Sequence, residues 1–340
     1  MAGLIGARSD EITFTSSGTE ANAWALTGLA KARETQGRHL VICAVEHLSI
    51  LQTARRMEKE GWRVTVVPVD RAGRVGAQSV EEAMTPETAL VSIQWANGEV
   101  GTIQPMAEIL RRVKAKGALL HSDAVAAAGQ IPIDVGRIPV DALSLAANGF
   151  GGPPGVGALF VRKGVRIAPM FIGGTQEDGR RAGTENLIGI VGMGAAAAVA
   201  QKNLRDGQER LTTLRDRLIH GILERVSLTT LNGHPSDRLP GHSSFSFSGV
   251  DAETLLLALD LEGVAVGLGS ACTSRTMKAS HVLKAMGVPD SQALGTLSCT
   301  LGHRNTEEEI GQVLEILPRV VAAHRASRRD ISHEELTHNR

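Results

Sequence analysis

The feature that most constrains the fold of this chain is a regular alternation of short apolar runs with helical stretches over residues 11–162. Most of the runs are continuously apolar, which is typical of strands buried on both faces of a parallel sheet. The pattern therefore predicts a doubly wound α/β domain. Strands are predicted at residues 11–15, 40–45, 63–69, 89–94, 118–122, 142–146 and 157–162, and helices between them at residues 20–34, 49–60 and 106–116.

The remainder of the chain has a different texture, beginning with a long helical stretch over residues 186–226. Strands are predicted at 243–248 and 264–266 and helices at 252–261 and 305–326, the last opened by Asn305 or Thr306 with acidic residues in its first turn. We therefore expect a large α/β domain over residues 1–207, a smaller α+β domain over 208–325, and a frayed or disordered tail over 326–340.

Composition narrows the range of functions. The chain of 340 residues carries 36 basic and 36 acidic side chains, so it has no bulk attraction to nucleic acid or to an anionic membrane. No apolar run approaches the roughly 20 residues of a membrane span, and the first residues lack the layout of a secretion signal. We expect a cytoplasmic protein. The cysteines, Cys43, Cys272 and Cys299, are too few and too far apart for a disulfide framework or a zinc motif.

Four short motifs follow predicted strands, where open α/β sheets bind their ligands. Residues 14–22, FTSSGTEAN, place Gly18 and Thr19 at a helix start, which is either an anion site or an ordinary helix cap. His47 follows the second strand, and Asn97 lies in a turn-rich loop over 96–104. Asp123 ends another strand, where it would hold a cationic ring nitrogen or cap the next helix.

The order and spacing of these motifs resemble those of cysteine desulfurases, in the class V aminotransferase group. The resemblance runs from residue 2 to about residue 322 and implies the type I fold of pyridoxal-phosphate enzymes, with a seven-stranded, mainly parallel sheet. It rests on FTSSGTEAN, VEHLSI, NGEVGTIQP, HSDA, GGTQEDGRRAGTEN, GSACTS and LGHRNTEEEI. The family's opening segment has no counterpart here, so we expect an apolar face that something else must cover.

The resemblance assigns roles to several side chains. It implies that the cofactor phosphate sits on Gly18 and Thr19, that His47 stacks on the ring, and that Asn97 lies beside the ring hydroxyl. Asp123 would pair with the ring nitrogen. The remaining two matches are Thr184, a phosphate contact given to the neighbouring subunit of a dimer, and Cys272, the nucleophile that takes sulfur as a persulfide.

The chain departs from the family at the positions that would bind the cofactor covalently and transfer protons. The position of the Schiff-base lysine is Gly149, and no lysine occurs between Lys116 and Lys163. Without that amine the cofactor has no covalent tether and the substrate no proton shuttle. We therefore expect no covalently bound cofactor and at most weak binding of pyridoxal phosphate. The other departures are Asn148, Ala146, Ala126, Ser298 and His303, which replace a histidine, a serine, a glutamine and two arginines.

Two interpretations remain open. The first is a non-catalytic desulfurase homologue, a binding or scaffold protein that forms a homodimer or a heterodimer with a desulfurase paralogue in sulfur or iron–sulfur metabolism. The second is an enzyme or sulfur carrier that uses Cys272 as a persulfide site, or that binds a ligand non-covalently in the remodelled pocket. A sulfur-acceptor protein is a further expected partner. A metal or cluster site drawing on Cys272, Cys299, His47, Asp123 and His303 is a lesser alternative, so no metal ligand is assigned.

Overall fold

The structure, a computed structural model, describes residues 1–269 and 279–338. The chain forms two compact units. The first comprises Met1–Asp70, Arg74–Gly98 and Thr102–Asp206, and the second comprises Arg71–Gly73, Glu99–Gly101 and Gly207–Arg340. The main division follows Asp206, inside a long helix. No sequence pattern indicated that two three-residue segments of the first half would group with the second unit.

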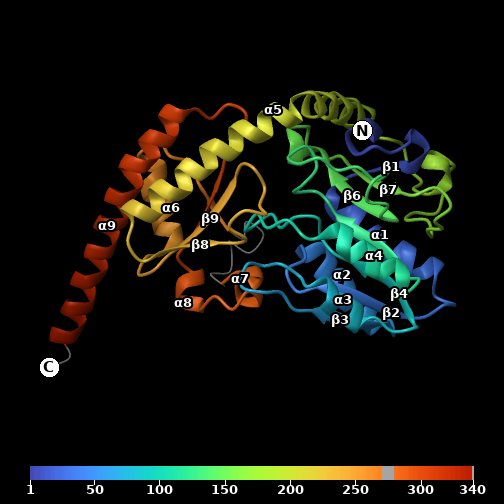
Figure 1. Cartoon of the computed structure of the whole chain (residues 1–340), viewed down its shortest axis with the longest axis horizontal. Coiled ribbons are helices and arrows are strands. Elements are labelled where there is room, and N and C mark those ends of the chain that lie inside the picture. Colours follow the sequence, from blue (N-terminus) through green and yellow to red (C-terminus); the bar gives the residue numbers. More distant parts are fainter. Residues whose placement is uncertain (270–278, 339–340) are drawn as a thin grey trace. The chain divides into compact units, whose positions relative to one another are not determined.

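The first unit is built on a seven-stranded sheet in the order β1-β7-β6-β5-β4-β2-β3 (Figure 1). Only β7 runs against the other six strands, which confirms the predicted, mainly parallel sheet. The strands are β1 (Ile12–Thr15), β2 (His39–Cys43), β3 (Arg63–Val67), β4 (Thr88–Ser92), β5 (Leu119–Asp123), β6 (Ala142–Ala146) and β7 (Gly157–Val161).

Helices connect these strands and supply much of the core. They are α1 (Gly18–Ala32), α2 (Leu48–Lys59), α3 (Ala77–Ala83) and α4 (Met106–Ala115). Helix α1 packs across the middle of the sheet, where the fully buried Trp24 and Leu29 meet Leu40 and Leu159. The Trp24 indole N–H donates to the carbonyl of Ala168 at 2.8 Å, so burial of this side chain leaves no polar atom without a partner.

Parallel strands bring the motifs of the sequence to one side of the sheet. We call the edge at which β1, β2, β4, β5 and β6 end the carboxyl edge. The segment before α1, the residues after β2, the loop after β4, the end of β5 and the turn after β6 all lie there. The 3₁₀ turn after β6, η3 (Ala147–Phe150), contains Gly149. The fold thus groups most of the predicted site residues of the first unit at this edge.

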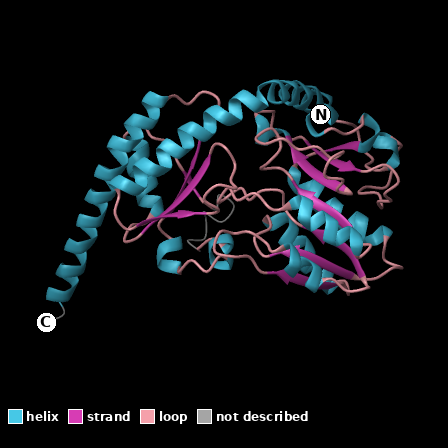
Figure 2. Ribbon diagram, in the orientation of Figure 1, coloured by secondary structure: helices cyan, strands magenta, loops and turns pink. Residues whose placement is uncertain are grey.

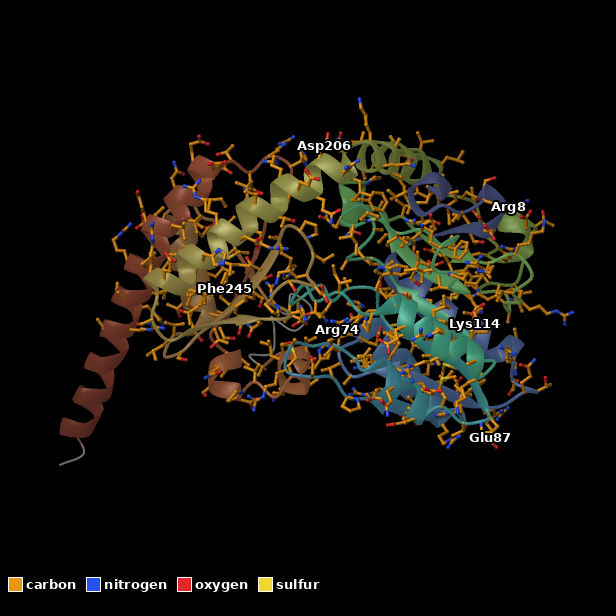
Figure 3. The ribbon with its side chains drawn as sticks, viewed as in Figure 1. Arg8, Arg74, Glu87, Lys114, Asp206 and Phe245 are labelled. Carbon is orange, nitrogen blue, oxygen red and sulfur yellow. The ribbon has the colours of Figure 1, made fainter. Side chains whose placement is uncertain are left out.

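The second unit contains a four-stranded antiparallel sheet in the order β10-β11-β9-β8 (Figure 2). Its strands are β8 (Thr229–Asn232), β9 (His242–Phe247), β10 (Gly267–Leu268) and β11 (Thr296–Thr300). Phe245, labelled in Figure 3, and Phe247 are fully buried with ring centroids 6.1 Å apart. They join a core formed with the C-terminal half of α5 (Leu187–Arg225), α6 (Ala252–Leu261) and α9 (Glu307–His338).

Several predicted elements of this unit need correction. The strand predicted at 264–266 is wrong, because the paired residues are Gly267 and Leu268, which bond to β11 instead. Strands β8 and β11 were not predicted, and neither were the short helices α7 (His281–Ala285) and α8 (Asp290–Ala293). Helix α9 continues to His338, beyond the helix end predicted at residue 326.

Helix α5 has an apolar stretch that the sequence analysis underestimated. An 18-residue window has a mean hydropathy of 1.3, enough by length and composition to cross a membrane, and 17% of that window is buried. Glycine and alanine, rather than large apolar residues, make up much of it. Leu187, Ile188 and Val191 at its start are largely exposed.

Candidate functional site

The start of α1 has the properties of an anion site. The Ser17 side chain caps the helix by accepting the Glu20 N–H at 3.1 Å. Within the described residues, no hydrogen bond uses the N–H groups of Gly18 and Thr19. These two donors stand at the positive end of a 15-residue helix dipole. The start of α1 therefore has the free donors that the predicted phosphate position would require.

Asp123 ends β5 as a buried carboxylate and is held by two donors. The Val125 N–H reaches one of its oxygens at 2.9 Å, and the Asn22 amide Nδ2 reaches the other at 2.6 Å. Burial raises the pKa of Asp123, and these two hydrogen bonds oppose that rise. Asn22 also donates to the Ser49 hydroxyl at 2.9 Å, which lies 2.7 Å from Nδ1 of the exposed His47. A hydrogen-bonded chain thus links the predicted ring-stacking histidine to the predicted ring-nitrogen partner.

A second buried carboxylate, Glu46, lies beside this group. Its Oε1 accepts the Gln94 N–H at 2.7 Å, and the residue is fully buried. Burial raises the pKa of Glu46 well above its ordinary value, and the Asp123 carboxylate raises it further. Asn97, also buried, donates to the Val45 carbonyl at 3.1 Å. The same Nδ2 also lies 3.5 Å from Oε1 of Gln94.

We expect Glu46→Gln to stabilise the protein at alkaline pH. A carboxyl group whose pKa is raised by folding contributes stability below its unfolded-state pKa and loses it as the pH rises through the folded-state value. Glutamine keeps the acceptor for Gln94 and cannot ionise. The variant should gain about 1–3 kcal/mol over the wild type at pH 9, measured by thermal unfolding between pH 5 and pH 9.

The control for this prediction is Glu58→Gln, on the exposed side of α2. It should follow the wild-type pH profile. A Glu46→Gln profile that also follows the wild type would show that Glu46 titrates as it does in water.

The position predicted for the Schiff-base lysine has no amine, and it also has no room for a side chain. A Cβ atom on Gly149 would lie 2.4 Å from the carbonyl oxygen of Val125, closer than real side chains approach. A Cβ on Gly18 would lie 2.6 Å from Cγ2 of the same valine and 3.4 Å from Cβ of Ala146. The turn carrying Gly149 therefore packs directly on the segment that follows Asp123.

No other lysine of the first unit takes its place. Lys31 and Lys59 lie at the ends of helices that begin at the carboxyl edge, so they lie at the opposite edge. The ammonium of Lys114, labelled in Figure 3, pairs with Asp141, directly before β6 begins. Lys116 lies just beyond Lys114 at the same end of α4. Lys163 follows β7, and because that strand runs in the reverse direction, Lys163 also lies at the opposite edge. Lys202 is exposed on α5.

The remaining predicted residues lie elsewhere. Ser298 and His303, the positions of the two family arginines, belong to the second unit, where the Ser298 hydroxyl lies 3.4 Å from Nε2 of His242. Cys272 lies outside the described residues. Burial raises the pKa of Cys43, and that of Cys299 to about 12, so neither is a ready nucleophile. Within the described part of the chain, no three His, Cys, Asp or Glu side chains group as metal ligands.

Thr184 lies in the first unit, on the segment between β7 and α5. It is exposed and lines a cavity of about 100 Å³ together with Ser16 and Glu177. Arg181 of the same segment pairs with Glu20 of α1 at 2.9 Å, and the Glu177 carboxylate accepts the Phe14 N–H at 3.2 Å. The segment that contains GGTQEDGRRAGTEN is thus anchored to the start of α1.

Comparison with known proteins agrees with this geometry. The model of the aminotransferase class-V family matches residues 1–313. A cysteine desulfurase IscS of Clostridium botulinum (strain Hall) is 46% identical over 324 residues, which cover 94% of this chain and 81% of that protein. A cysteine desulfurase of Sinorhizobium fredii is 46% identical over 328 residues, covering 96% and 84%. The chain belongs to the cysteine desulfurase family.

Solved structures of the family show the same fold. A NifS-like protein superimposes with a TM-score of 0.87 at 36% identity, covering 94% of this chain and 85% of that one. A NifS-like protein of Rickettsia africae gives 0.83 at 31% identity, with the same coverage. Pyridoxal phosphate is the cofactor of this family. The site of the present member must therefore be tested against it.

The residues of this cysteine desulfurase homologue fit the two ends of the cofactor but not its attachment. Free N–H groups at Gly18 and Thr19 suit a phosphate, and Asp123 with Asn22 suits a protonated ring nitrogen. No lysine of the first unit reaches the middle, and Gly149 has no room for a side chain. The residues present therefore do not fit covalently bound pyridoxal phosphate.

Two polar residues that organise the site, and a buried carboxylate beside them, were not predicted from the sequence. Asn22 and Ser49 stand inside the motifs FTSSGTEAN and VEHLSI but were given no role. Asn22 is four residues after Gly18, so one helical turn carries it from the anion site to Asp123. That spacing was a usable signal. The burial of Glu46 had no comparable signal.

Proposed function

We propose that this protein is a cysteine desulfurase homologue that does not carry out the cofactor-dependent step itself. It would act as a binding or scaffold protein in cytoplasmic sulfur or iron–sulfur metabolism, as a homodimer or as the partner of a desulfurase paralogue. The observation that carries the proposal is the closed position at Gly149, where a side chain would collide with the Val125 carbonyl.

Further support comes from departures that all affect the same chemistry. Ala146 cannot donate a hydroxyl to a phosphate, and Asn148 cannot carry the charge of a histidine. Ser298 offers no bidentate grip on a substrate carboxylate. A chain under selection for the family reaction would not be expected to lose these groups together.

A second function, sulfur transfer through Cys272, is favoured by the comparisons. The relatives at 46% identity are named cysteine desulfurases, and the motif GSACTS retains the cysteine. In this alternative the Cys272 thiolate attacks the outer sulfur of a donor persulfide and releases the donor thiolate. The step needs no cofactor in this chain, so it is compatible with the loss of the lysine.

The decisive experiment treats the purified protein with pyridoxal phosphate and then with borohydride. We expect no reduced adduct on any lysine at the carboxyl edge in peptide mass spectra, and no sulfide release from cysteine. Glycine in place of the lysine removes general acid–base catalysis worth roughly 10²–10⁴-fold, besides the covalent tether. A lysine-linked adduct together with sulfide release would overturn the proposal.

Mass spectrometry after exposure to a persulfide donor tests the second function. Sulfur carriage predicts a 32-Da addition at the position of Cys272, about the mass of one sulfur atom, that Cys272→Ser abolishes. The buried Cys43 and the half-buried Cys299, both with raised thiol pKa values, serve as internal controls and should remain unmodified. Addition at those two thiols alone would contradict it.

A further inference from the structure

We propose that the first unit binds a phosphorylated pyridine ring without bonding to it, holding the aldehyde, amine and alcohol forms with similar affinity. This inference rests on the proposed function, because it assumes that no lysine captures the ligand. It goes further by naming a ligand class and a selectivity that differ from those of a lysine-bearing site.

The first step concerns the anionic end of the ligand. Gly18 and Thr19 leave two N–H groups without partners at the start of α1, while Ser17 satisfies the next donor. A helix dipole and free N–H groups favour a phosphate over a neutral group. A Cβ on Gly18 would clash with Val125, so only glycine permits this packing of the turn.

The second step concerns the opposite end and stands on independent contacts. Asn22 is 1% exposed, and within the described part of the chain its Oδ1 has no partner, although its Nδ2 donates to both Asp123 and Ser49. Because the Asp123 carboxylate accepts from Nδ2, Oδ1 is the amide atom that is left without a partner. A buried amide oxygen without a partner beside a carboxylate calls for a donor, preferably a cationic one. A protonated ring nitrogen meets that need.

The third step concerns the part of the ligand between these ends. In a lysine-bearing site, an aldehyde gains affinity by forming an imine, which an amine or an alcohol cannot form. Here Gly149 supplies no amine and has no space for one, and Lys31, Lys59, Lys114, Lys116 and Lys163 lie at the opposite edge of the sheet. The aldehyde therefore gains no extra affinity from imine formation. The phosphate donors and Asp123 contact groups that the aldehyde, amine and alcohol forms share.

The structure also assigns Asn22 as the positioning residue of this site. It orients Asp123 from α1 and joins it to Ser49, and thereby to His47. Removing its amide should weaken ring binding without affecting the phosphate donors. Because Asn22 and Thr27 lie on the same helix, Thr27→Ala is a suitable control. The Thr27 hydroxyl donates only to the carbonyl of Ala23 within α1.

Tryptophan fluorescence provides a readout that needs no catalysis. The Trp95 N–H donates to the carbonyl of Asp123 at 2.8 Å, so a buried indole is attached to the site by its backbone. The full chain is titrated with pyridoxal 5′-phosphate, pyridoxamine 5′-phosphate, pyridoxine 5′-phosphate and unphosphorylated pyridoxine. We expect the three phosphorylated forms to agree within about threefold and pyridoxine to bind at least about tenfold more weakly.

The variants separate the two ends of the site. Asp123→Asn should weaken all three phosphorylated ligands by about tenfold or more, and Asn22→Ala by about three- to tenfold. Thr27→Ala should leave the affinities unchanged. Circular dichroism checks that each variant is folded, and if Asp123→Asn is not folded, Asn22→Ala alone decides.

Each outcome bears on one claim. Binding of the aldehyde more than about tenfold tighter than the amine would overturn the selectivity. Failure of all forms to bind, with no borohydride adduct, would overturn this inference and leave the proposed function intact. A lysine adduct at the carboxyl edge together with sulfide release would overturn the proposed function first, and the inference with it.

Discussion

Gly149→Lys is expected to lower the free energy of unfolding by about 2–3 kcal/mol and to leave sulfide release from cysteine undetectable. The new Cβ would lie 2.4 Å from the Val125 carbonyl oxygen, so either η3 or the segment after Asp123 must move. A shifted backbone does not place the amine at the required position, and small misplacements reduce catalysis severely. Urea unfolding and a sulfide assay with added pyridoxal phosphate measure both effects.

The control is Gly207→Lys, in the middle of α5, where an added Cβ meets nothing within 4 Å. Lysine is a better helix former than glycine, so this variant should be neutral or up to about 1 kcal/mol more stable. Sulfide release by Gly149→Lys would contradict the prediction, because it would show that one side chain separates this protein from an active desulfurase.

Recovery of the family activity would need a wider change than one lysine. Val125 contributes both the carbonyl that blocks Gly149 and the methyl group that packs at Gly18. Ala146, close to that methyl group, stands where the family has a serine. The closed turn thus reflects the packing of one small cluster rather than one absent functional group.

The strands of the first unit could be predicted from the sequence because each depends on a short, local run of apolar residues. Continuous apolar runs such as 142–146 match strands buried on both faces, and the end of each parallel strand must lie at one edge. Gly18, His47, Asn97 and Asp123 could therefore be placed together before any coordinates. Helix α3 was not predicted because seven residues are too few to show a helical pattern of apolar positions.

What could not be predicted depends on contacts between distant residues. The clash at Gly149 arises from a backbone atom 24 positions earlier, and backbone carries no sequence signal. The short strand β10 depends on pairing with β11 rather than on its own residues, which explains the wrong prediction at 264–266. Glu46 reads as an ordinary polar residue after a strand, although the fold buries it completely.

Arg238→Ala is expected to lower the stability of the second unit by about 3–5 kcal/mol. The buried Arg238 guanidinium donates to the carbonyls of His234 and Asn232, each at 2.7 Å, and to that of His242 at 3.4 Å. Burial and the neighbouring Arg215 lower its pKa to about 10, so it remains a cation at neutral pH. Alanine would leave these carbonyls without their donor. Calorimetry of the full chain, which can resolve separate transitions, measures the loss.

Arg217→Ala is the matched control, because Arg217 forms an exposed pair with Glu307 at 3.1 Å and should change stability by less than about 1 kcal/mol. Arg238→Lys should fall between the two, since one ammonium keeps the charge but cannot span carbonyls that a planar guanidinium reaches together. If Arg238→Ala cost no more than Arg217→Ala, water would have to satisfy the carbonyls. The guanidinium would then be a buried charge tolerated by the fold rather than a structural clamp of the loop between β8 and β9.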